Sequence, residues 1–391
     1  MMMASWIKVR LDACCTIVSG ATPSTSDEAF WHGDVCWATP KDLSELDGSY
    51  ISDTPRKITR MGLDSCAASI IPANSVLFSS RAPIGHVAVN TIPMATNQGF
   101  KSFVPKQGML ESKFLYWWLL TNRSYLESLG NGATFKEVSK AIVSKIEIPL
   151  PPMEEQRKIA DILDKAEALR AKRRAALLQL DELTQSIFLD MFGDPATNPK
   201  KWPVKNFGEV GKVITGNTPP RANPANYGNN IEWIKSDNIV PSSSYATRAD
   251  EWLSQEGKAM ARVAPAGAIL ITCIAGSPDC IGKAAMTGRE VAFNQQINAI
   301  VPFKGETLFY YAQIVVAKRL IQEASTASMK GMVSKGRLEQ VGLIVPPLFL
   351  QQEFAKRIES VEKLKASHKK SLSKLDELFA SLQQRAFRGE L

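Results

Sequence analysis

The chain has 391 residues, of which 45% are apolar, so it can form hydrophobic cores and a generally disordered protein is excluded. Its length predicts about two to four domains. No apolar stretch approaches the about 18 residues of a membrane span, and residues 1–10 lack the apolar segment of a secretion signal, so we expect a cytoplasmic protein with no membrane partner. Lysine and arginine number 47 against 39 acidic residues, and the net charge of +8 favours a polyanionic partner.

Cysteine and histidine form no recognisable metal-binding or nucleophilic pattern. The six cysteines include no CxxC pair, and the three histidines are widely separated. We therefore predict free thiols in a reducing compartment and no bound metal.

The sequence is an internal repeat of about 195 residues, which is half of the chain. Short motifs recur in the same order at offsets of 195 to 197 residues: Gly-x-Thr-Pro at 20–23 and 216–219, Asn-Gln at 97–98 and 294–295, Val-Ser-Lys at 138–140 and 333–335, Pro-Pro at 151–152 and 346–347, and Leu-Asp-Glu-Leu at 180–183 and 375–378. The part of each copy before the Pro-Pro pair is less similar than the part after it. The two copies are therefore more alike in their second part than in their first.

The first part of each copy predicts a compact α+β domain. Short apolar runs such as 75–78 and 268–272 are bounded by Gly, Pro, Asn and Asp, which is typical of short strands and turns. A helical stretch follows near 112–129, and its counterpart lies near 308–323.

The segments 153–191 and 348–387 predict two long helices, because they lack proline and glycine and are rich in strong helix formers. A Pro-Pro pair precedes each segment, and Gly193 and Gly389 end them. Apolar residues spaced by three and four predict a coiled-coil seam. The predicted seam and partner interface comprises Ile159, Ile162, Leu169, Arg173, Leu180, Leu183, Phe354, Val361, Leu364, His368, Leu375 and Leu378, with Ala166, Ala176, Ile187 and Leu382 in the same frame. Two separate amphipathic helices, each packed on its own domain, remain the alternative.

Arg173 and His368 interrupt this seam at the same heptad position, near the middle of each helix. The second globular domain joins the end of the first helix to the start of the second, and a compact domain has its ends close together, which favours an antiparallel pair. Our hypothesis is that these two residues meet at the centre of the pair, with the globular domains at its two ends around a pseudo-twofold axis. The predicted organisation is a domain at 1–150, a helical spacer at 151–194, a second domain at 195–345 and a second spacer at 346–391.

Most of the positive charge lies outside the helices. Residues 153–190 carry a net charge of −1 and residues 347–391 carry +3, which leaves +6 for the remainder. Basic residues in polar turns, expected at equivalent positions of both domains, suit phosphates, and the Asn-Gln pairs suit base edges. The alternative for the Asn-Gln pairs is a turn whose side chains bond the backbone. The candidates are Thr22, Lys41, Arg81, Asn97, Gln98, Lys101, Thr134, Lys136, Lys140, Thr218, Arg221, Lys235, Asn294, Gln295, Ser328, Lys330 and Lys335.

Catalytic motifs are not recognisable. The sequence has no GxxxxGK[ST] phosphate loop, no GxGxxG after a strand and no amino-methyltransferase motif. Glu256 and Lys258, with Asp237 upstream, loosely resemble a metal nuclease triad, but the first repeat does not reproduce it. We therefore expect a chain that is not an enzyme and has no catalytic residues.

Taken in order, the duplicated motifs resemble the specificity subunit of type I restriction-modification enzymes over essentially the whole chain. The resemblance is carried by the Gly-x-Thr-Pro turns, Asn-Gln-Gly-Phe at 97–100, Ile-Pro-Leu-Pro-Pro-Met-Glu-Glu-Gln at 148–156, Phe-Gly-Asp-Pro at 192–195 and Ala-Phe-Arg-Gly-Glu-Leu at 386–391. The second copy departs from the pattern, since Gln296 replaces the glycine and residues 348–352 lack the acidic pair.

The resemblance implies two target recognition domains, each reading one half of a bipartite site in double-stranded DNA. It also implies a helical pair that sets the half-site spacing and docks two modification (methyltransferase) subunits, with restriction/translocase subunits as further partners. S-adenosylmethionine, ATP and Mg²⁺ would belong to those partners, with no cofactor in this chain. A non-DNA adaptor with two protein-binding domains on a coiled-coil rod is the main alternative, and a self-sufficient DNA methyltransferase or nuclease is the third.

Overall fold

The computed structural model describes residues 6–81, 83–132, 136–326 and 331–391. The chain forms two compact units: the first takes in residues 1–172 and 371–391, and the second takes in residues 173–370. The boundary falls within both long helices rather than beside them, because each half of the helical pair shares a hydrophobic core with one globular part.

The first unit is an α+β fold with three sheets. The strand orders are β2-β9-β6-β7-β4, β5-β3-β8 and β1-β10. Its elements are β1 (Ile7–Arg10), α1 (Leu11–Cys14), β2 (Cys15–Ser19), η1 (Glu28–Phe30), β3 (Trp31–Ala38), α2 (Pro40–Ser44), β4 (Tyr50–Ile51), β5 (Lys57–Ile58), α3 (Arg60–Asp64), β6 (Val76–Phe78), β7 (Val87–Asn90), β8 (Ala95–Thr96), β9 (Lys101–Pro105), α4 (Ser112–Thr121), α5 (Arg123–Ser128), α6 (Lys140–Ser144), β10 (Glu147–Leu150) and the first half of α7 (Met153–Phe192).

The second unit repeats most of this order, but η3 replaces α2, no strand among the described residues corresponds to β4, and β15 and η4 are additional. Its sheets are β12-β19-β16-β17, β14-β13-β18-β15 and β11-β20. Its elements are β11 (Val204–Asn206), α8 (Phe207–Val210), β12 (Gly211–Thr215), η2 (Pro224–Asn226), β13 (Tyr227–Ile234), η3 (Ser236–Asn238), β14 (Trp252–Leu253), α9 (Gln255–Met260), β15 (Val263–Ala264), β16 (Ile269–Thr272), η4 (Pro278–Cys280), β17 (Ala284–Met286), β18 (Val291–Phe293), β19 (Ile297–Pro302), α10 (Thr307–Val316), α11 (Lys318–Glu323), α12 (Lys335–Glu339), β20 (Gly342–Ile344) and the first part of α13 (Leu348–Ala386).

The predicted α+β class and internal repeat are confirmed. In each unit a long strand, β3 or β13, pairs parallel with a short one, β8 or β18. Each predicted helical stretch is two helices, α4–α5 and α10–α11, because the chain leaves helical geometry at Asn122 and at Ala317. The long helices begin and end within one residue of the predicted 153–191 and 348–387.

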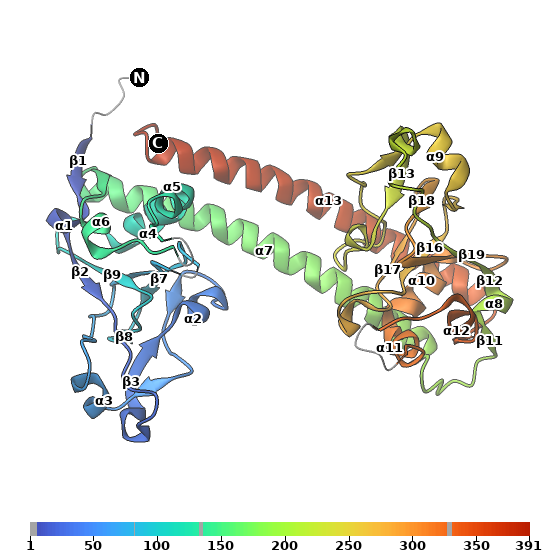
Figure 1. The fold of residues 1–391 in the computed structure, drawn as a ribbon, viewed down its shortest axis with the longest axis horizontal. Helices are drawn as coiled ribbons and strands as arrows, with labels where there is room; N and C mark the ends of the chain where they lie inside the picture. The colour runs from blue at the N-terminus through green and yellow to red at the C-terminus, as the bar shows by residue number, and fades with distance from the viewer. Residues whose placement is uncertain (1–5, 82, 133–135, 327–330) are drawn as a thin grey trace. The chain divides into compact units, whose positions relative to one another are not determined.

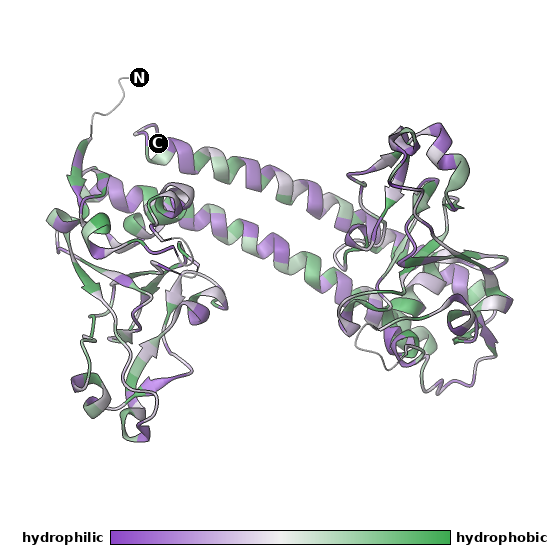
Figure 2. Ribbon diagram, in the orientation of Figure 1, coloured by the Kyte–Doolittle hydropathy of each residue, from purple (hydrophilic) through white to green (hydrophobic). Residues whose placement is uncertain are grey.

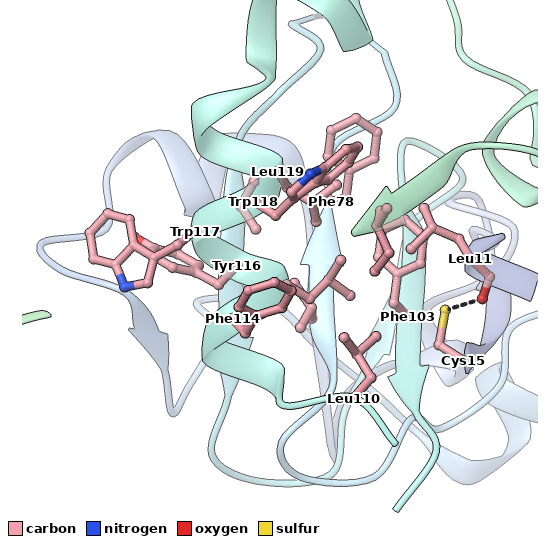
Figure 3. Close-up of a cluster of buried hydrophobic side chains, with 14 of the residues drawn as sticks. Leu11, Cys15, Phe78, Phe103, Leu110, Phe114, Tyr116, Trp117, Trp118 and Leu119 are labelled. Carbon is pink, nitrogen blue, oxygen red and sulfur yellow. Dashed lines mark hydrogen bonds between the residues drawn. The ribbon is translucent and has the colours of Figure 1, made fainter. Parts of the chain in front are cut away.

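Aromatic residues of α4 organise the core of the first unit. Figure 3 shows Phe114 and Trp118 beside Phe78 and Phe103 of the sheet, and Figure 1 shows α4 and α6 between the sheets and the start of α7. Trp117 Nε1 donates to a carboxylate of α7, Asp164, at 2.9 Å. The first half of α7 is therefore held to its globular part by both apolar packing and a hydrogen bond.

A cluster of phenylalanine rings holds the long helices to the globular part of the second unit. Phe188 and Phe192 of α7, Phe309 of α10 and Phe354 of α13 are all fully buried. Their ring centroids lie 4.9–6.3 Å apart. Because aromatic residues bury large areas, this cluster fixes both helices to the globular part of the second unit.

A buried glutamine holds the first turn of each long helix. The Gln156 side chain donates to the carbonyls of Met109 and Pro151 at 3.0 and 2.8 Å and accepts from the amide of Glu111 at 2.8 Å. Gln351 binds the backbone of the second unit in the same way through two of these three bonds. The glutamine of the Glu-Glu-Gln motif is thus the residue that links the helix to its globular part.

The two long helices pair along a seam that the sequence predicted only in part. Apolar and polar bands alternate along both helices in Figure 2. The shielded positions are Ile159, Leu163, Ala166, Arg170, Arg173, Leu177, Leu180, Thr184 and Ile187 of α7, and Phe354, Ile358, Val361, Lys365, His368, Leu372, Leu375, Phe379, Leu382 and Ala386 of α13. The predicted heptad position that contains Arg173 and His368 is correct in both helices.

The second predicted heptad position is wrong by one residue. The misplaced residues are Ile162, Leu169, Leu183, Leu364 and Leu378, each of which directly precedes a more shielded residue. The four leucines are 43–54% exposed. The predicted frame has apolar residues where the observed one has Arg170, Thr184 and Lys365, so apolar spacing favoured the wrong frame.

Charged side chains occupy the central part of the seam. In the first unit the guanidinium of Arg170 pairs with Glu167 and with Asp376, whose Oδ1 lies 2.6 Å from Nε. The same guanidinium lies 4.3 Å from the ring centroid of Phe379. An arginine at this position can be shielded because two carboxylates and an aromatic face compensate its charge.

The second unit repeats this arrangement with a lysine. Lys365 Nζ lies 2.7 Å from Asp181 Oδ1 and 2.8 Å from Glu362 Oε1. Burial works against the charged form, but the two carboxylates outweigh it and raise the pKa of Lys365.

Arg173 Nη1 and His368 Nδ1 are 3.3 Å apart, so the hypothesis that they meet is confirmed. Residue numbers fall in α13 as they rise in α7, so the pair is antiparallel.

Candidate nucleic-acid interface

Two turns lie against each other in the first unit and form the centre of the candidate site. The amide of Ala21, in the Gly-x-Thr-Pro turn, donates to the carbonyl of Thr96 at 3.0 Å. Thr22 Oγ1 donates to Gln98 Oε1. A Cβ at Gly20 would lie 2.0 Å from the carbonyl oxygen of Asn97, so only glycine permits this close approach.

The second unit contains the same pair of turns. The amide of Asn217 donates to the carbonyl of Phe293 at 3.1 Å, and Thr218 Oγ1 donates to Gln295 Oε1. A Cβ at Gly216 would lie 2.1 Å from the carbonyl oxygen of Asn294. The two motifs that the sequence repeat singled out are therefore one structural feature in each unit.

A buried tryptophan donates a hydrogen bond to the Gly-x-Thr-Pro turn of each pair. Trp37 Nε1 donates to the carbonyl of Ala21 at 3.0 Å, and Trp233 Nε1 donates to the carbonyl of Asn217 at 3.3 Å. Both tryptophans are 2% exposed and lie on the strand that pairs parallel with β8 or β18. This support makes each pair of turns a fixed surface feature.

The asparagines and glutamines of these turns have different environments. Asn97 Oδ1 accepts from the amide of Gly99 at 2.9 Å, and the buried Asn294 accepts from the amide of Gln296 at 3.1 Å. The asparagines thus stabilise their own turns, which was the alternative interpretation. Gln98 and Gln295 are exposed, so the glutamines are the amides that can face a ligand.

The predicted basic contacts of the first unit fall into two groups. Lys41 and Lys136 are exposed, and Arg81 is half-buried beside Glu137. The prediction for Lys101 is wrong, because its side chain is buried and its Nζ lies 3.1 Å from Glu137 Oε1. The candidates Thr134, Ser328 and Lys330 lie outside the described residues.

The expectation that basic residues occupy equivalent positions in both domains is also wrong for most of them. Lys41 is the second residue of α2, and Lys235 directly follows β13. Among the basic candidates that the structure describes, only Lys140 and Lys335 correspond, as the first residues of α6 and α12 after a capping serine. The two domains therefore offer different cations around a similar pair of turns.

Sequence reasoning missed an arginine beside the turns of the first unit. The guanidinium carbon of Arg56 lies 4.0 Å from the ring centroid of Trp31 and 5.1 Å from that of Trp37. The two indoles meet edge-on, with centroids 5.1 Å apart. The Trp-x₅-Trp spacing at 31–37 was the signal available in the sequence, but it does not identify the arginine that covers the rings.

The second unit has a cluster of three charged groups at the same place. Arg221 Nη2 lies 2.9 Å from Glu251 Oε2, and Lys235 Nζ lies 2.5 Å from Glu251 Oε1. Both cations also lie over Trp233, at 5.0 and 5.3 Å from its ring centroid. The hydrogen bond from Lys235, together with the charge of Arg221, lowers the pKa of Glu251, so this carboxylate is ionised at neutral pH.

The described residues offer little other chemistry. All six cysteines are free, and burial raises the pKa of the Cys273 thiol to about 11. Lys258 of the loose nuclease-like triad pairs with Glu290. Within the described ranges, no group of three His, Cys, Asp or Glu side chains could hold a metal ion. Among the helices of the same residues, none is long and apolar enough to cross a membrane.

Comparison with known proteins agrees with the repeat. The specificity subunit of the type I restriction enzyme MjaIX from Methanocaldococcus jannaschii is 36% identical to this chain over 233 residues. The matched region covers 55% of this chain and 54% of that protein. It thus spans about half the length of this relative. The EcoDI specificity subunit of Escherichia coli is 22% identical over 373 residues, or 84% of this chain and 82% of the relative.

Solved structures show a similar fold. A chain from the assembly of a type I R-M system has a TM-score of 0.60 at 20% identity and covers 100% of both chains. The type I restriction-modification S subunit of M. genitalium has a TM-score of 0.54 at 14% identity, with 99% and 98% of the two chains covered. The profile of the type I restriction modification DNA specificity domain matches residues 3–179 and again residues 199–377. With two consecutive copies of that domain, the chain belongs to the type I restriction modification DNA specificity family.

Proposed function

We propose that this chain is the DNA-recognition subunit of a type I restriction-modification complex and that each unit reads one half of a bipartite site in double-stranded DNA. The observation that carries the proposal is the duplicated pair of turns, with an exposed glutamine and different charged residues around each copy. A shared framework with different surface groups suits two readers of unlike sequences, because bases are distinguished by side chains at the surface.

The helical pair would set the spacing of the half-sites and dock the partner subunits. Leu169, Leu183, Leu364 and Leu378 are exposed on α7 and α13, and exposed apolar residues on a paired helix suit a protein interface. Two modification subunits would bind there, and restriction/translocase subunits would join them. In this proposal the complex works in the cytoplasm.

The catalytic chemistry would belong to the partner subunits. S-adenosylmethionine for methylation, and ATP and Mg²⁺ for translocation and cleavage, would bind there rather than to this chain. The proposal therefore treats the chain as non-catalytic. Equilibrium dialysis of the isolated chain against labelled S-adenosylmethionine tests this directly, and binding to this chain alone would contradict it.

Duplex binding as a function of salt tests the DNA role. The complex with the modification subunits should bind duplex DNA with an affinity that falls steeply as salt rises. Lys41→Ala should weaken binding and reduce the slope of log K against log[salt] by about 0.9, because one phosphate contact is lost. The matched variant Lys41→Arg keeps the charge and should keep the slope. Absence of duplex binding by the complex would favour the adaptor function instead, and an unchanged slope in Lys41→Ala would remove Lys41 from the interface.

A further inference from the structure

The two units differ at the aromatic surface beside the paired turns. In the first unit it is formed by Trp31 and Trp37, and in the second by Tyr227 and Trp233, whose ring centroids are 6.3 Å apart. Trp37 of β3 and Trp233 of β13 each donate to the Gly-x-Thr-Pro turn of their unit. A side chain over these rings is therefore adjacent to the candidate DNA surface.

One backbone hydrogen bond defines equivalent residues at this place. The amide of Trp37 donates to the carbonyl of Arg56 at 3.3 Å, and the amide of Trp233 donates to the carbonyl of Glu251 at 3.0 Å. Arg56 and Glu251 thus occupy the same position in the two folds. The same position carries a cation in the first unit and an anion in the second.

Their surroundings differ accordingly. The Arg56 guanidinium is exposed over the two indoles, and no carboxylate among the described residues pairs with it. Thr54 Oγ1 donates to its carbonyl oxygen at 2.7 Å and fixes the backbone. In the second unit, by contrast, Glu251 is held between Arg221 and Lys235.

The inverted charge favours base readout over a phosphate contact. Every nucleotide carries a phosphate, so a phosphate site common to both domains would keep its positive charge. The carboxylate of Glu251 cannot itself bind a phosphate, although Arg221 and Lys235 leave the group of three charges net positive. Two half-sites of different sequence present different base edges. A position that reads bases would therefore carry different side chains in the two units, as Arg56 and Glu251 do.

Resting on the proposed function, we infer that Arg56 is a specificity-determining residue that reads a guanine in one half-site. Its planar fork can donate two hydrogen bonds to guanine O6 and N7. The stack on Trp31 and Trp37 limits the orientations of the guanidinium. At the equivalent place the cluster of Arg221, Glu251 and Lys235 determines a base preference in the other half-site.

Selection from a random duplex library tests the inference with the full complex of this chain and the modification subunits. The wild-type complex should select two half-sites separated by a fixed gap. Arg56→Gln should relax one guanine position in one half-site, with a loss of discrimination of about 10- to 100-fold. Arg56→Lys should relax the same position less, because lysine can still donate to guanine. Arg56→Lys keeps the charge, so the slope of affinity against salt should stay at the wild-type value.

The matched variant in the second unit is Glu251→Gln. It should change a base preference in the other half-site and leave the half-site read through Arg56 unchanged. A wild-type guanine preference in Arg56→Gln would overturn the inference, since glutamine lacks the cationic fork that donates to guanine O6 and N7. An equal loss of base discrimination in both half-sites would overturn the inference as well, because a general structural defect would affect the two half-sites alike. If the wild-type complex selects no bipartite site, the proposed function itself fails, and the variants play no part in that result.

Discussion

Single residues link each long helix to its globular part, and Gln351 shows how much one side chain can do. It is 2% exposed, donates to the carbonyl of Pro346 at 2.8 Å and accepts from the amide of Glu306 at 3.2 Å. The link runs through backbone groups, so it tolerates the sequence differences between the two copies. This explains why a glutamine recurs at 156 and 351 although the acidic pair before it does not.

Gln351→Ala should destabilise the second unit by about 2–6 kcal/mol, because a buried and a half-buried backbone group lose their partner and each costs about 1–3 kcal/mol. The neighbouring Gln352 is exposed, so Gln352→Ala should stay within about 0.5 kcal/mol of wild type. Hydrogen exchange of peptides covering 304–316 and 346–358 measures both effects, and urea unfolding confirms the ranking. Equal protection in the two variants would contradict the role of Gln351.

At this scale the sequence identified the right segments more reliably than the right side chains. The Asn-Gln and Gly-x-Thr-Pro motifs do meet, but the pattern did not distinguish Asn97, which bonds its own turn, from the exposed Gln98. Lys101 was misassigned because alternation in a short strand does not show that Glu137, a residue distant in sequence, buries it. Arg56 was missed because its stack on two indoles depends on contacts between separate strands.

At the scale of elements, the long helices show both the strength and the limit of periodicity. Composition and flanking prolines predicted their ends almost to the residue. The seam was half correct, since leucines flank it on both sides and polar residues such as Arg170 and Lys365 lie within it. Buried ion pairs between separate segments leave no periodic signal, so sequence reasoning treats these positions as exposed.

The frame of the seam can be tested with two adjacent residues of α13. Phe379 is buried and its ring centroid lies 5.6 Å from that of Trp117, so Phe379→Ala should cost about 3–5 kcal/mol. Leu378 is 51% exposed, and Leu378→Ala should cost less than about 0.5 kcal/mol. Urea unfolding followed by far-UV circular dichroism compares the two variants with wild type. A larger effect for Leu378→Ala would restore the frame first predicted from the sequence.

At the scale of the whole molecule, the repeat extends to the contacts that hold the helices together. Glu167, Arg170 and Asp376 in the first unit correspond to Glu362, Lys365 and Asp181 in the second, each 195 residues along the chain or back. Arg173 and His368 are likewise 195 residues apart, and they contact each other. Duplication thus produced a pair of helices that carry the same groups in opposite order. The sequence predicts the contact of Arg173 with His368, because both hold the same heptad position near the middle of an antiparallel pair, but it does not predict the ion pairs beside them.

If the helices set the half-site spacing, lengthening both by one heptad should change the recognised site. Seven residues inserted after Lys172 and seven after Lys370 keep the three-four seam in register and add about 10 Å to the pair, or about three base pairs at about 3.4 Å each. Sequencing of methylated adenines in cells that carry the modification subunits should then show the same half-sites with a longer gap. Insertion of four residues at the same points should instead weaken methylation, because it interrupts the heptad phase of the seam between its two parts. A methylated site with its original gap after the heptad insertion would contradict the spacing role and leave the helices as a partner dock alone.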